Sequence, residues 1–197
     1  MKKIPTLFLR DWDGNPKHVT REPNPECAWV FAGEGEPTVK WDGTCVKLDE
    51  DGAWWARREV KRGKADPPSL VLVEEDQETG KRVGWEPIEQ SGFARYHAEA
   101  VAGSGHEFAP GTYELLGPKV NGNPDRFAGH VLMRHGWAPL GIREDAKTAP
   151  RDYDGLAAWL AERPYEGVVW HHPDGVRFAK IKRRDFPASH QSGEASR

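Results

Sequence analysis

The sequence is poor in cysteine and has no long apolar run, and each absence excludes a class of protein. Cys27 and Cys45 are the only cysteines among 197 residues, they lack the C-x-x-C spacing of a zinc site, and nothing else indicates an oxidising compartment. No run approaches the length of a membrane-spanning helix, and no apolar signal-peptide core follows the basic residues 1–3. We therefore expect a cytoplasmic protein with reduced thiols and no membrane association.

The sequence also lacks an excess of positive charge, and its histidines lack the spacing of metal ligands. The net charge is −3, whereas nucleic-acid-binding domains are often strongly basic. His171 and His172 are adjacent, so on a strand they would point to opposite faces and could not chelate one ion together. Residues 33–37 form a turn that lacks the lysine and the spacing of a phosphate-binding loop. A zinc site and a phosphate-binding loop are therefore not predicted.

Basic residues are nevertheless grouped, and each group is either a solvated face or a phosphate site. The first group is Arg57, Arg58, Lys61, Arg62 and Lys64, and the second is Lys180, Lys182, Arg183 and Arg184.

What the sequence does contain is a lysine on a short loop between two β-rich segments. Apolar and polar residues alternate over residues 44–48, as in a half-buried strand, and Val39 precedes the loop, so Lys40 is predicted to lie at a strand mouth. Asp42 and Gly43 form the turn, and the glycine tolerates positive φ or lets a ligand approach the main chain. A partly shielded lysine loses its proton more easily, and a neutral amine is a nucleophile. Lys-x-Asp-Gly also occurs by chance in surface hairpins, so the rest of the chain must decide.

Short strands and few helices are predicted along the chain. Strands are expected at residues 27–31, 44–48, 53–60, 70–73 and 111–117, with a hairpin of residues 167–172 and 176–182. Residues 90–102 are expected to form one helix. Asp152 or Asp154 is expected to cap a second helix that ends before Pro164.

Two features of these strands concern charge. Glu114 lies in an apolar segment, where an unpaired buried carboxylate is costly. It could pair with a basic residue in a structural role, bind a sugar hydroxyl, or bind a metal ion. Lys180 and Lys182 are two residues apart on one strand, so they project to the same face and repel each other unless an anion lies between them. The lysine pair is therefore predicted to clamp a phosphate.

The candidate site residues fall into five short motifs spread along the chain. These are Lys40-Trp41-Asp42-Gly43-Thr44, Arg57, Tyr113-Glu114-Leu115-Leu116-Gly117, Glu166-Gly167-Val168-Val169-Trp170 and Lys180-Ile181-Lys182. In order and approximate interval, they resemble the motifs of the covalent nucleotidyltransferases, the superfamily of ATP-dependent ligases. The chain is most similar to the small stand-alone 5′ to 3′ RNA ligases of the vertebrate type, over residues 27–186. The closer match is carried by Asn121-Gly122-Asn123-Pro124 after the third motif and by His171, Asp174 and Gly175 after the fourth.

The resemblance implies a three-step joining of RNA ends. The Lys40 amine attacks the α-phosphate of ATP and pyrophosphate leaves; AMP then passes to an RNA 5′-phosphate; finally a 3′-hydroxyl displaces AMP and seals the strand. The implied cofactors are ATP and Mg²⁺, with Mn²⁺ as an alternative. The implied partner is RNA with 5′-phosphate and 3′-hydroxyl ends, and no protein partner is indicated.

Residue roles follow from the matching positions. Lys40 is the implied nucleophile; because an ordinary lysine is charged at neutral pH, a metal ion together with Lys180 and Lys182 would have to lower its pKa. The two lysines would also grip the α-phosphate. Glu114 would hold the ribose hydroxyls and Glu166 a magnesium ion, with Glu114 as a second candidate metal ligand.

Other implied contacts concern the nucleotide and the RNA. Around the nucleotide these are Glu36 at the base, Val39, Asp42 and Gly43 beside the nucleophile, Arg57 near the sugar, and Phe127 or Trp137 stacking on the adenine. Implied RNA contacts are Arg57, Lys61 and Arg183.

An α+β fold is implied as well, namely a nucleotidyltransferase (ATP-grasp-like ligase) core of antiparallel sheets with flanking helices. One domain is expected over residues 1–186, followed by a polar, serine-rich tail at residues 187–197 that is expected to be disordered. Because so little sequence follows Lys182, no C-terminal OB domain like that of DNA ligases and capping enzymes is expected. A minimal ligase is therefore favoured.

Three alternatives stay open. A DNA ligase or guanylyltransferase on the same core would differ in nucleotide preference, since labelled NAD or GTP would replace ATP. A non-catalytic RNA-end-binding protein would keep the fold without turnover, although it has no use for a nucleophilic lysine. A structural β-rich protein would require several independent motifs to coincide by accident.

Overall fold

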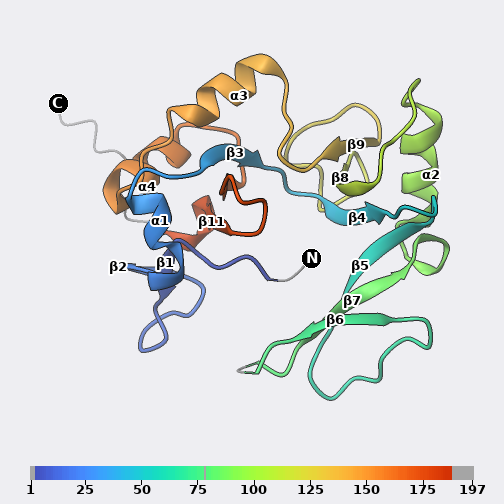
Figure 1. The fold of residues 1–197 in the computed structure, drawn as a ribbon, viewed down its shortest axis with the longest axis horizontal. Helices are drawn as coiled ribbons and strands as arrows, with labels where there is room; N and C mark the ends of the chain where they lie inside the picture. The colour runs from blue at the N-terminus through green and yellow to red at the C-terminus, as the bar shows by residue number, and fades with distance from the viewer. Residues whose placement is uncertain (1–2, 78, 188–197) are drawn as a thin grey trace. The chain divides into compact units, whose positions relative to one another are not determined.

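The computed structural model describes residues 3–77 and 79–187, which divide into two compact units (Figure 1). Among these residues, unit 1 consists of residues 42–135 with Lys3, and unit 2 consists of residues 4–41 and 136–187. The chain passes from unit 2 to unit 1 at the bond that joins Trp41 to Asp42. The single domain expected over residues 1–186 stays a prediction, and the expected tail lies, from residue 188 onward, outside the described residues.

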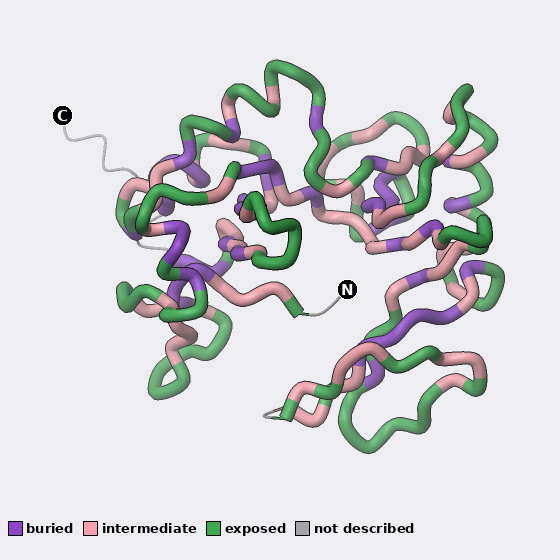
Figure 2. Tube along the Cα trace, viewed as in Figure 1, coloured by how far each residue is buried: buried purple, intermediate pink, exposed green. Residues whose placement is uncertain are grey.

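Unit 1 is built on one six-stranded sheet in which all neighbouring strands are antiparallel, in the order β6-β7-β5-β4-β8-β9. The strands are β4 (Thr44–Leu48), β5 (Trp54–Val60), β6 (Val71–Glu75), β7 (Arg82–Pro87), β8 (Gly111–Leu116) and β9 (Val131–Arg134). A 3-10 helix, η2 (Ile88–Gln90), and the helix α2 (Ala94–Ala102) follow β7. The four central residues of β7 are buried (Figure 2).

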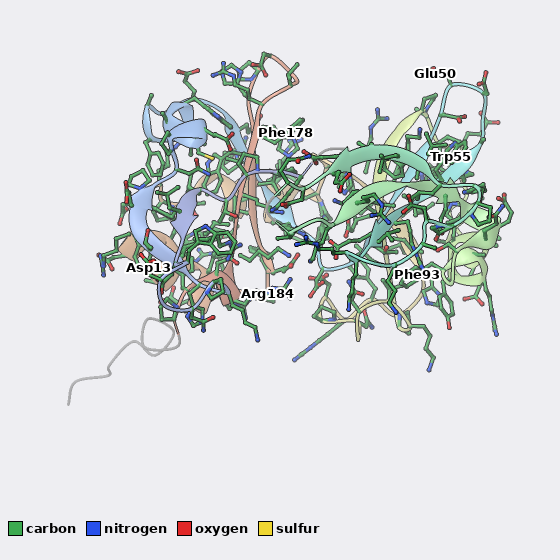
Figure 3. The ribbon with its side chains drawn as sticks, turned by 90° about the horizontal axis from the view of Figure 1, so that it is seen from below. Asp13, Glu50, Trp55, Phe93, Phe178 and Arg184 are labelled. Carbon is green, nitrogen blue, oxygen red and sulfur yellow. The ribbon has the colours of Figure 1, made fainter. Side chains whose placement is uncertain are left out.

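Side chains alternate along these strands, which gives the sheet two different faces. On one face, Val46 stands between Ala56 and Tyr113 of the neighbouring strands, and all three are buried. The same core cluster includes Ala100 of α2, and Phe93 packs against it (Figure 3), so α2 covers this face. The opposite face carries Lys47 of β4 and Arg57 of β5.

Unit 2 contains a three-stranded antiparallel sheet of order β11-β10-β3 and a hairpin of β1 and β2. The strands are β1 (Phe8–Arg10), β2 (Val19–Pro23), β3 (Glu36–Lys40), β10 (Gly167–His171) and β11 (Phe178–Lys182). The helices are α1 (Ala28–Phe31), α3 (Leu140–Lys147) and α4 (Tyr153–Ala161), with 3-10 helices η1 (Pro25–Cys27) and η3 (Arg183–Asp185). Thr6 forms an isolated parallel bridge with Lys180.

One face of the three-stranded sheet belongs to the core of unit 2. Val39, Val168 and Ile181 stand opposite one another in register, and all three are buried. Because side chains alternate along a strand, the residues that flank these three point to the other face. That other face carries the candidate site described below.

One predicted strand is wrong. Residues 27–31 form the end of η1 and the helix α1. The side chain of Asn24 accepts a hydrogen bond from the backbone N–H of Glu26, and Pro25 suits the first helical position. A short apolar run does not by itself distinguish a strand from a helix. Here the residues before the run decide for the helix.

The remaining elements agree with the coarse prediction of a mixed α+β protein with mostly antiparallel sheets and few helices. The predicted helix at residues 90–102 begins only at Ala94, after η2. Asp152 is the cap of α4, since its side chain accepts a hydrogen bond from Gly155 N–H. The elements β1, β2, β7, β9 and α3 were not predicted, and the last two residues of the predicted turn at 33–37 instead begin β3. Within the part of the chain that the structure describes, no helix has the length and apolarity needed to cross a bilayer.

Candidate functional site

The predicted site residues of unit 2 meet on one face of its three-stranded sheet. In register, Lys40 of β3 and Lys182 of β11 stand on either side of Gly167 of β10. Residues paired across antiparallel strands point to the same face, so the two lysines lie together there. Lys180 occupies the next position on that face, as its spacing from Lys182 predicts. In Figure 3, the labels Phe178 and Arg184 mark the start of β11 and a residue shortly after its end.

Glu166, which immediately precedes β10, receives both lysines. Lys40 Nζ donates to Glu166 Oε2 at 2.6 Å, and Lys182 Nζ lies 2.5 Å from Glu166 Oε1. The Glu166 side chain is only 7% exposed, while the Lys40 and Lys182 side chains are 21% and 16% exposed. Arg184 Nη2 lies 3.5 Å from the same Oε1 atom. We call Lys40, Glu166 and Lys182 the lysine cluster; it holds more positive than negative charge.

Burial and charge together set the protonation of the lysine cluster. Burial alone would raise the pKa of Glu166, but the ammonium groups of Lys40 and Lys182 outweigh it and hold this pKa below its ordinary value. Burial, followed by repulsion from Lys40, lowers the pKa of Lys182. Lys182 therefore gives up its proton more easily than an exposed lysine does.

The backbone on both sides of the lysine cluster is held by side chains. Arg183 donates from its guanidinium to the carbonyl oxygen of Tyr165 at 2.6 Å, and its backbone N–H donates to Glu166 O at 2.8 Å. The buried carboxylate of Asp185 accepts from Lys182 N–H at 2.8 Å. Arg183, a predicted RNA contact, is therefore half-buried and bound to main chain, whereas the neighbouring Arg184 is exposed.

Gly167 is required where β10 passes between the two lysine-bearing strands. A Cβ atom on it would overlap the carbonyl oxygen of Ile181 and lie 2.8 Å from Lys182 Cα. Gly167→Ala is therefore expected to lower the free energy of unfolding by about 2 kcal/mol or more, because β11 must shift. Urea unfolding measures this loss.

The matched control is Gly141→Ala, in helix α3 of the same unit. Nothing lies within 4 Å of a Cβ atom built there, so alanine is expected to leave stability unchanged or raise it by up to about 1 kcal/mol. Equal stability of the Gly167→Ala variant and the unaltered protein would contradict the described register.

In unit 1, the turn that follows the nucleophile candidate is held by three side chains. Gly43 N–H donates to Glu114 Oε1, and Asp42 N–H donates to Asp125 Oδ2, both at 3.1 Å. Asn121 Nδ2 donates to Gly43 O at 2.7 Å and to Asp42 Oδ1 at 3.2 Å. Both backbone N–H groups of the turn are thus bound by carboxylates, which makes the turn well defined.

The protein itself accounts for the glycine of this turn. A Cβ atom on Gly43 would overlap the carbonyl oxygen of Leu115 and lie 2.8 Å from Glu114 Cγ. The sequence offered two reasons for this glycine, a positive φ or the close approach of a ligand. In the structure, the neighbouring strand β8 makes the close approach. Asn121 has φ of +46° and is thus in the left-handed region, which asparagine tolerates better than most residues.

Glu114 is buried, and its second oxygen has a partner that the sequence did not reveal. His135 Nε2 lies 2.8 Å from Glu114 Oε2, and His135 Nδ1 lies 2.9 Å from Thr112 Oγ1. We call Gly43, Glu114, His135 and Thr112 the Glu114 network. Of the three roles considered for Glu114, pairing with a basic residue is present; binding of a sugar hydroxyl or a metal ion stays a prediction. His135 directly follows β9, a strand that was not predicted.

His135→Ala is expected to lower the free energy of unfolding by about 1–3 kcal/mol, because it leaves one oxygen of the buried Glu114 carboxylate unpartnered. His135→Gln, which keeps a side-chain N–H donor, is expected to recover part of this loss. Urea unfolding of the two variants checks the order. Equal losses in both variants would show that the hydrogen bond to Glu114 contributes nothing.

Some of the other predicted nucleotide contacts belong to unit 1 and some to unit 2. Val39 is buried on the core face of β3, opposite to Lys40, so only its backbone is available to a nucleotide. Glu36 is exposed, with its carboxylate 3.9 Å from Lys147 Nζ. Phe127 is half-buried in unit 1, whereas Trp137 in unit 2 is 51% exposed. Stacking on adenine stays a prediction for both.

The two carboxylates predicted to hold a metal ion, Glu166 and Glu114, already have partners within the protein. Among the described residues, no group of three or more histidine, cysteine, aspartate or glutamate side chains could hold an ion. Both oxygens of Glu166 face ammonium groups, and both oxygens of Glu114 face N–H donors. Mg²⁺ commonly uses one or two carboxylates together with substrate phosphates and water. Binding of Mg²⁺ by Glu166 or Glu114 stays a prediction.

Comparisons with known proteins add no family. No protein-family model matches the chain, and no curated protein matches it significantly. The lysine cluster, the Glu114 network and the motifs in the sequence are therefore the features that bear on function.

Proposed function

We propose that this protein is an ATP-dependent RNA ligase that joins 5′-phosphate and 3′-hydroxyl ends through a lysyl-AMP and an adenylylated RNA. The observation that carries the proposal is the lysine cluster, in which Lys40 and Lys182 share the carboxylate of Glu166. A nucleophilic amine next to a second ammonium group is suited to an attack on a phosphate, because the second cation balances the charge that develops there.

The charge balance of the cluster supports binding of a polyphosphate. Lys40, Lys182 and the nearby Arg184 lie close to the carboxylate of Glu166, and a bound polyphosphate would add negative charge beside these cations. In the proposal, the α-phosphate of ATP binds to Lys182, and Lys180 contributes from the same face. Phosphoryl and nucleotidyl transfer depend mainly on such positioning and charge neutralisation.

The first step requires that Lys40 lose a proton. Glu166 Oε2, 2.6 Å from Lys40 Nζ, is within hydrogen-bond distance of that proton. The pKa of Glu166 is held down by the two ammonium groups. When phosphates neutralise Lys182, its ammonium group lowers the pKa of Glu166 less. The pKa of Glu166 then rises, and Glu166 becomes a better proton acceptor as the nucleotide binds. The neutral amine then forms a bond to the α-phosphorus while the bond to pyrophosphate breaks.

The Glu114 network supports a hydrogen-bonding role for the second predicted carboxylate. A carboxylate offers about four lone-pair positions, and Gly43 N–H and His135 Nε2 occupy two of them. The remaining positions suit the hydroxyl groups of a ribose. Mg²⁺ would enter with the nucleotide, held by its phosphates and at most one carboxylate of the protein, and would supply further charge neutralisation.

The deciding experiment mixes pure protein, magnesium and ATP labelled at the α-phosphate. A labelled protein band is expected, and addition of 5′-phosphorylated RNA is expected to move the label from protein to RNA and then release it as AMP. Labelling from GTP or NAD in place of ATP would instead indicate a guanylyltransferase or DNA ligase. No label from any of the three, with RNA still bound, would indicate a non-catalytic RNA-end-binding protein.

A further inference from the structure

The face of the six-stranded sheet opposite α2 carries two cations set among tryptophans. Lys47 of β4 pairs in register with Trp55 of β5, and Arg57, two residues further along β5, pairs with Trp85 of β7. All four side chains therefore point to the same face. Lys47 Nζ lies 5.3 Å from the ring centroid of Trp55 and 5.2 Å from that of Trp85, so both indoles hold the ammonium group (Figure 3 labels Trp55).

Neither cation forms an ion pair with a described residue, although the Asp49 carboxylate lies near Lys47: the hydrogen bond from Trp55 and, to a smaller extent, the charge of Lys47 lower the pKa of Asp49. Within residues 3–77 and 79–187, no ion pair involves Lys47 or Arg57, and the buried Nε of Arg57 has no hydrogen-bond acceptor. Nearby acids on this face are already engaged. Glu59 pairs with Lys81 at 3.1 Å, Asp49 accepts from Trp55 Nε1 at 2.7 Å, and Glu114 is bound by Gly43 N–H and His135. A buried donor without an acceptor is costly and uncommon in native proteins. An anionic group that binds the guanidinium group of Arg57 would offset part of this cost.

We propose that Lys47 and Arg57 form a phosphate-binding subsite for the backbone of single-stranded RNA, with the exposed part of the Trp55 indole as a surface against which a base can stack. Neighbouring strands lie about 4.8 Å apart, so the two cations stand close enough to contact one phosphate or two successive ones. Cations alternating with aromatic rings on an open sheet face suit single strands, because every nucleotide offers both a phosphate and a ring.

This proposal extends the proposed function by assigning part of its RNA substrate to unit 1, but it does not depend on adenylation. Arg57 is already an RNA contact that the resemblance implies, whereas Lys47 and Trp55 belong to none of the five motifs. Binding can be measured without ATP and equally well on a Lys40→Arg variant. Failure of RNA binding and failure of the ligase proposal are therefore separate results.

The test measures fluorescence anisotropy of a short, single-stranded, 5′-phosphorylated RNA with a fluorophore on its 3′ end, at several salt concentrations. Lys47→Met keeps the aliphatic stem against the two indoles and removes the charge. It is expected to weaken binding about tenfold at low salt and to reduce the slope of log K against log salt by about 0.7, as for one lost phosphate contact. Arg57→Gln is expected to act in the same direction, and Lys47→Arg is expected to retain the affinity.

The matched control is Lys17→Gln, which removes one charge from an exposed lysine of unit 2. It is expected to change the affinity by less than about twofold. Thermal unfolding verifies that each variant is folded, and Arg57→Gln serves as the test if Lys47→Met is not. Unchanged RNA binding by the tested variant, or an equal loss in Lys17→Gln, would overturn the proposal. Weakened ATP binding with unchanged RNA binding would assign the subsite to nucleotide phosphates instead.

Discussion

Replacing Lys40 by arginine is expected to lower the rate of AMP transfer from ATP to the protein by about a thousandfold or more. Arginine keeps a positive charge near Glu166, so the ion pair can persist and the fold is retained. A guanidinium group stays protonated in proteins, so it cannot act as the nucleophile. The measurement is the amount of label retained on the protein after incubation with magnesium and α-labelled ATP.

The control for this variant is Lys147→Arg, which makes the same change at a more exposed lysine of unit 2. Its labelling is expected to equal that of the unaltered protein. Thermal unfolding of the Lys40→Arg variant is expected to differ little from that of the unaltered protein. Full labelling of a folded Lys40→Arg variant would place the nucleophile elsewhere and remove the central argument for a ligase.

Replacing Glu166 by glutamine is expected to give the largest loss of stability, about 3 kcal/mol at neutral pH, together with loss of adenylation. The substitution removes the carboxylate that Lys40 and Lys182 share and leaves two largely buried ammonium groups side by side. Removal of one partner from a buried ion pair is strongly destabilising, because the remaining charge loses its compensation. Urea unfolding at neutral pH measures the loss.

The pH dependence of the same pair of proteins provides a second measurement. The pKa of Glu166 is lower in the folded protein than its ordinary value of 4.5, so the unfolded chain binds the proton more tightly. The contribution of Glu166 is therefore fully present above about pH 4.5 and is lost as the pH falls further. The stability difference between the unaltered protein and Glu166→Gln is expected to shrink in that range.

The control for the second prediction is Glu162→Gln, in the same unit. Its side chain is 81% exposed and lies 3.9 Å from Arg163, so its removal is expected to change stability little at any pH. A Glu166→Gln variant that resembles Glu162→Gln in stability would show that the two lysines do not depend on the Glu166 carboxylate.

The fold was predictable where the signal is local. The alternation over residues 44–48 and the turn residues of the hairpin that begins at Gly167 gave strands β4, β10 and β11, and Asp152 gave the start of α4. Residues 27–31 show the limit, since their apolar run fits either a strand or a helix and the cap at Asn24 decided. Strand β9 is only four residues long and half-buried, and it depends on pairing with β8.

The candidate site was predictable to a different degree in each unit. In unit 2, Lys40, Glu166 and Lys182 were identified from the motifs, and the structure brings their side chains together. In unit 1, Glu114 was identified, but its partner His135 was not. A histidine just after a short unpredicted strand has no distinguishing neighbours in the sequence, and only the pairing of β9 with β8 brings it to Glu114.

By itself, the sequence determined those features of this protein that depend on residues a few positions apart. They include the turn at Asp42 and Gly43 and the shared face of Lys180 and Lys182, because turn chemistry and strand alternation act locally. Only the tertiary structure decided which distant groups meet. Glu166 receives Lys40 from 126 positions away, and Glu114 receives Gly43 N–H from 71 positions away. Such contacts depend on the register between strands, which the packing of the whole sheet sets.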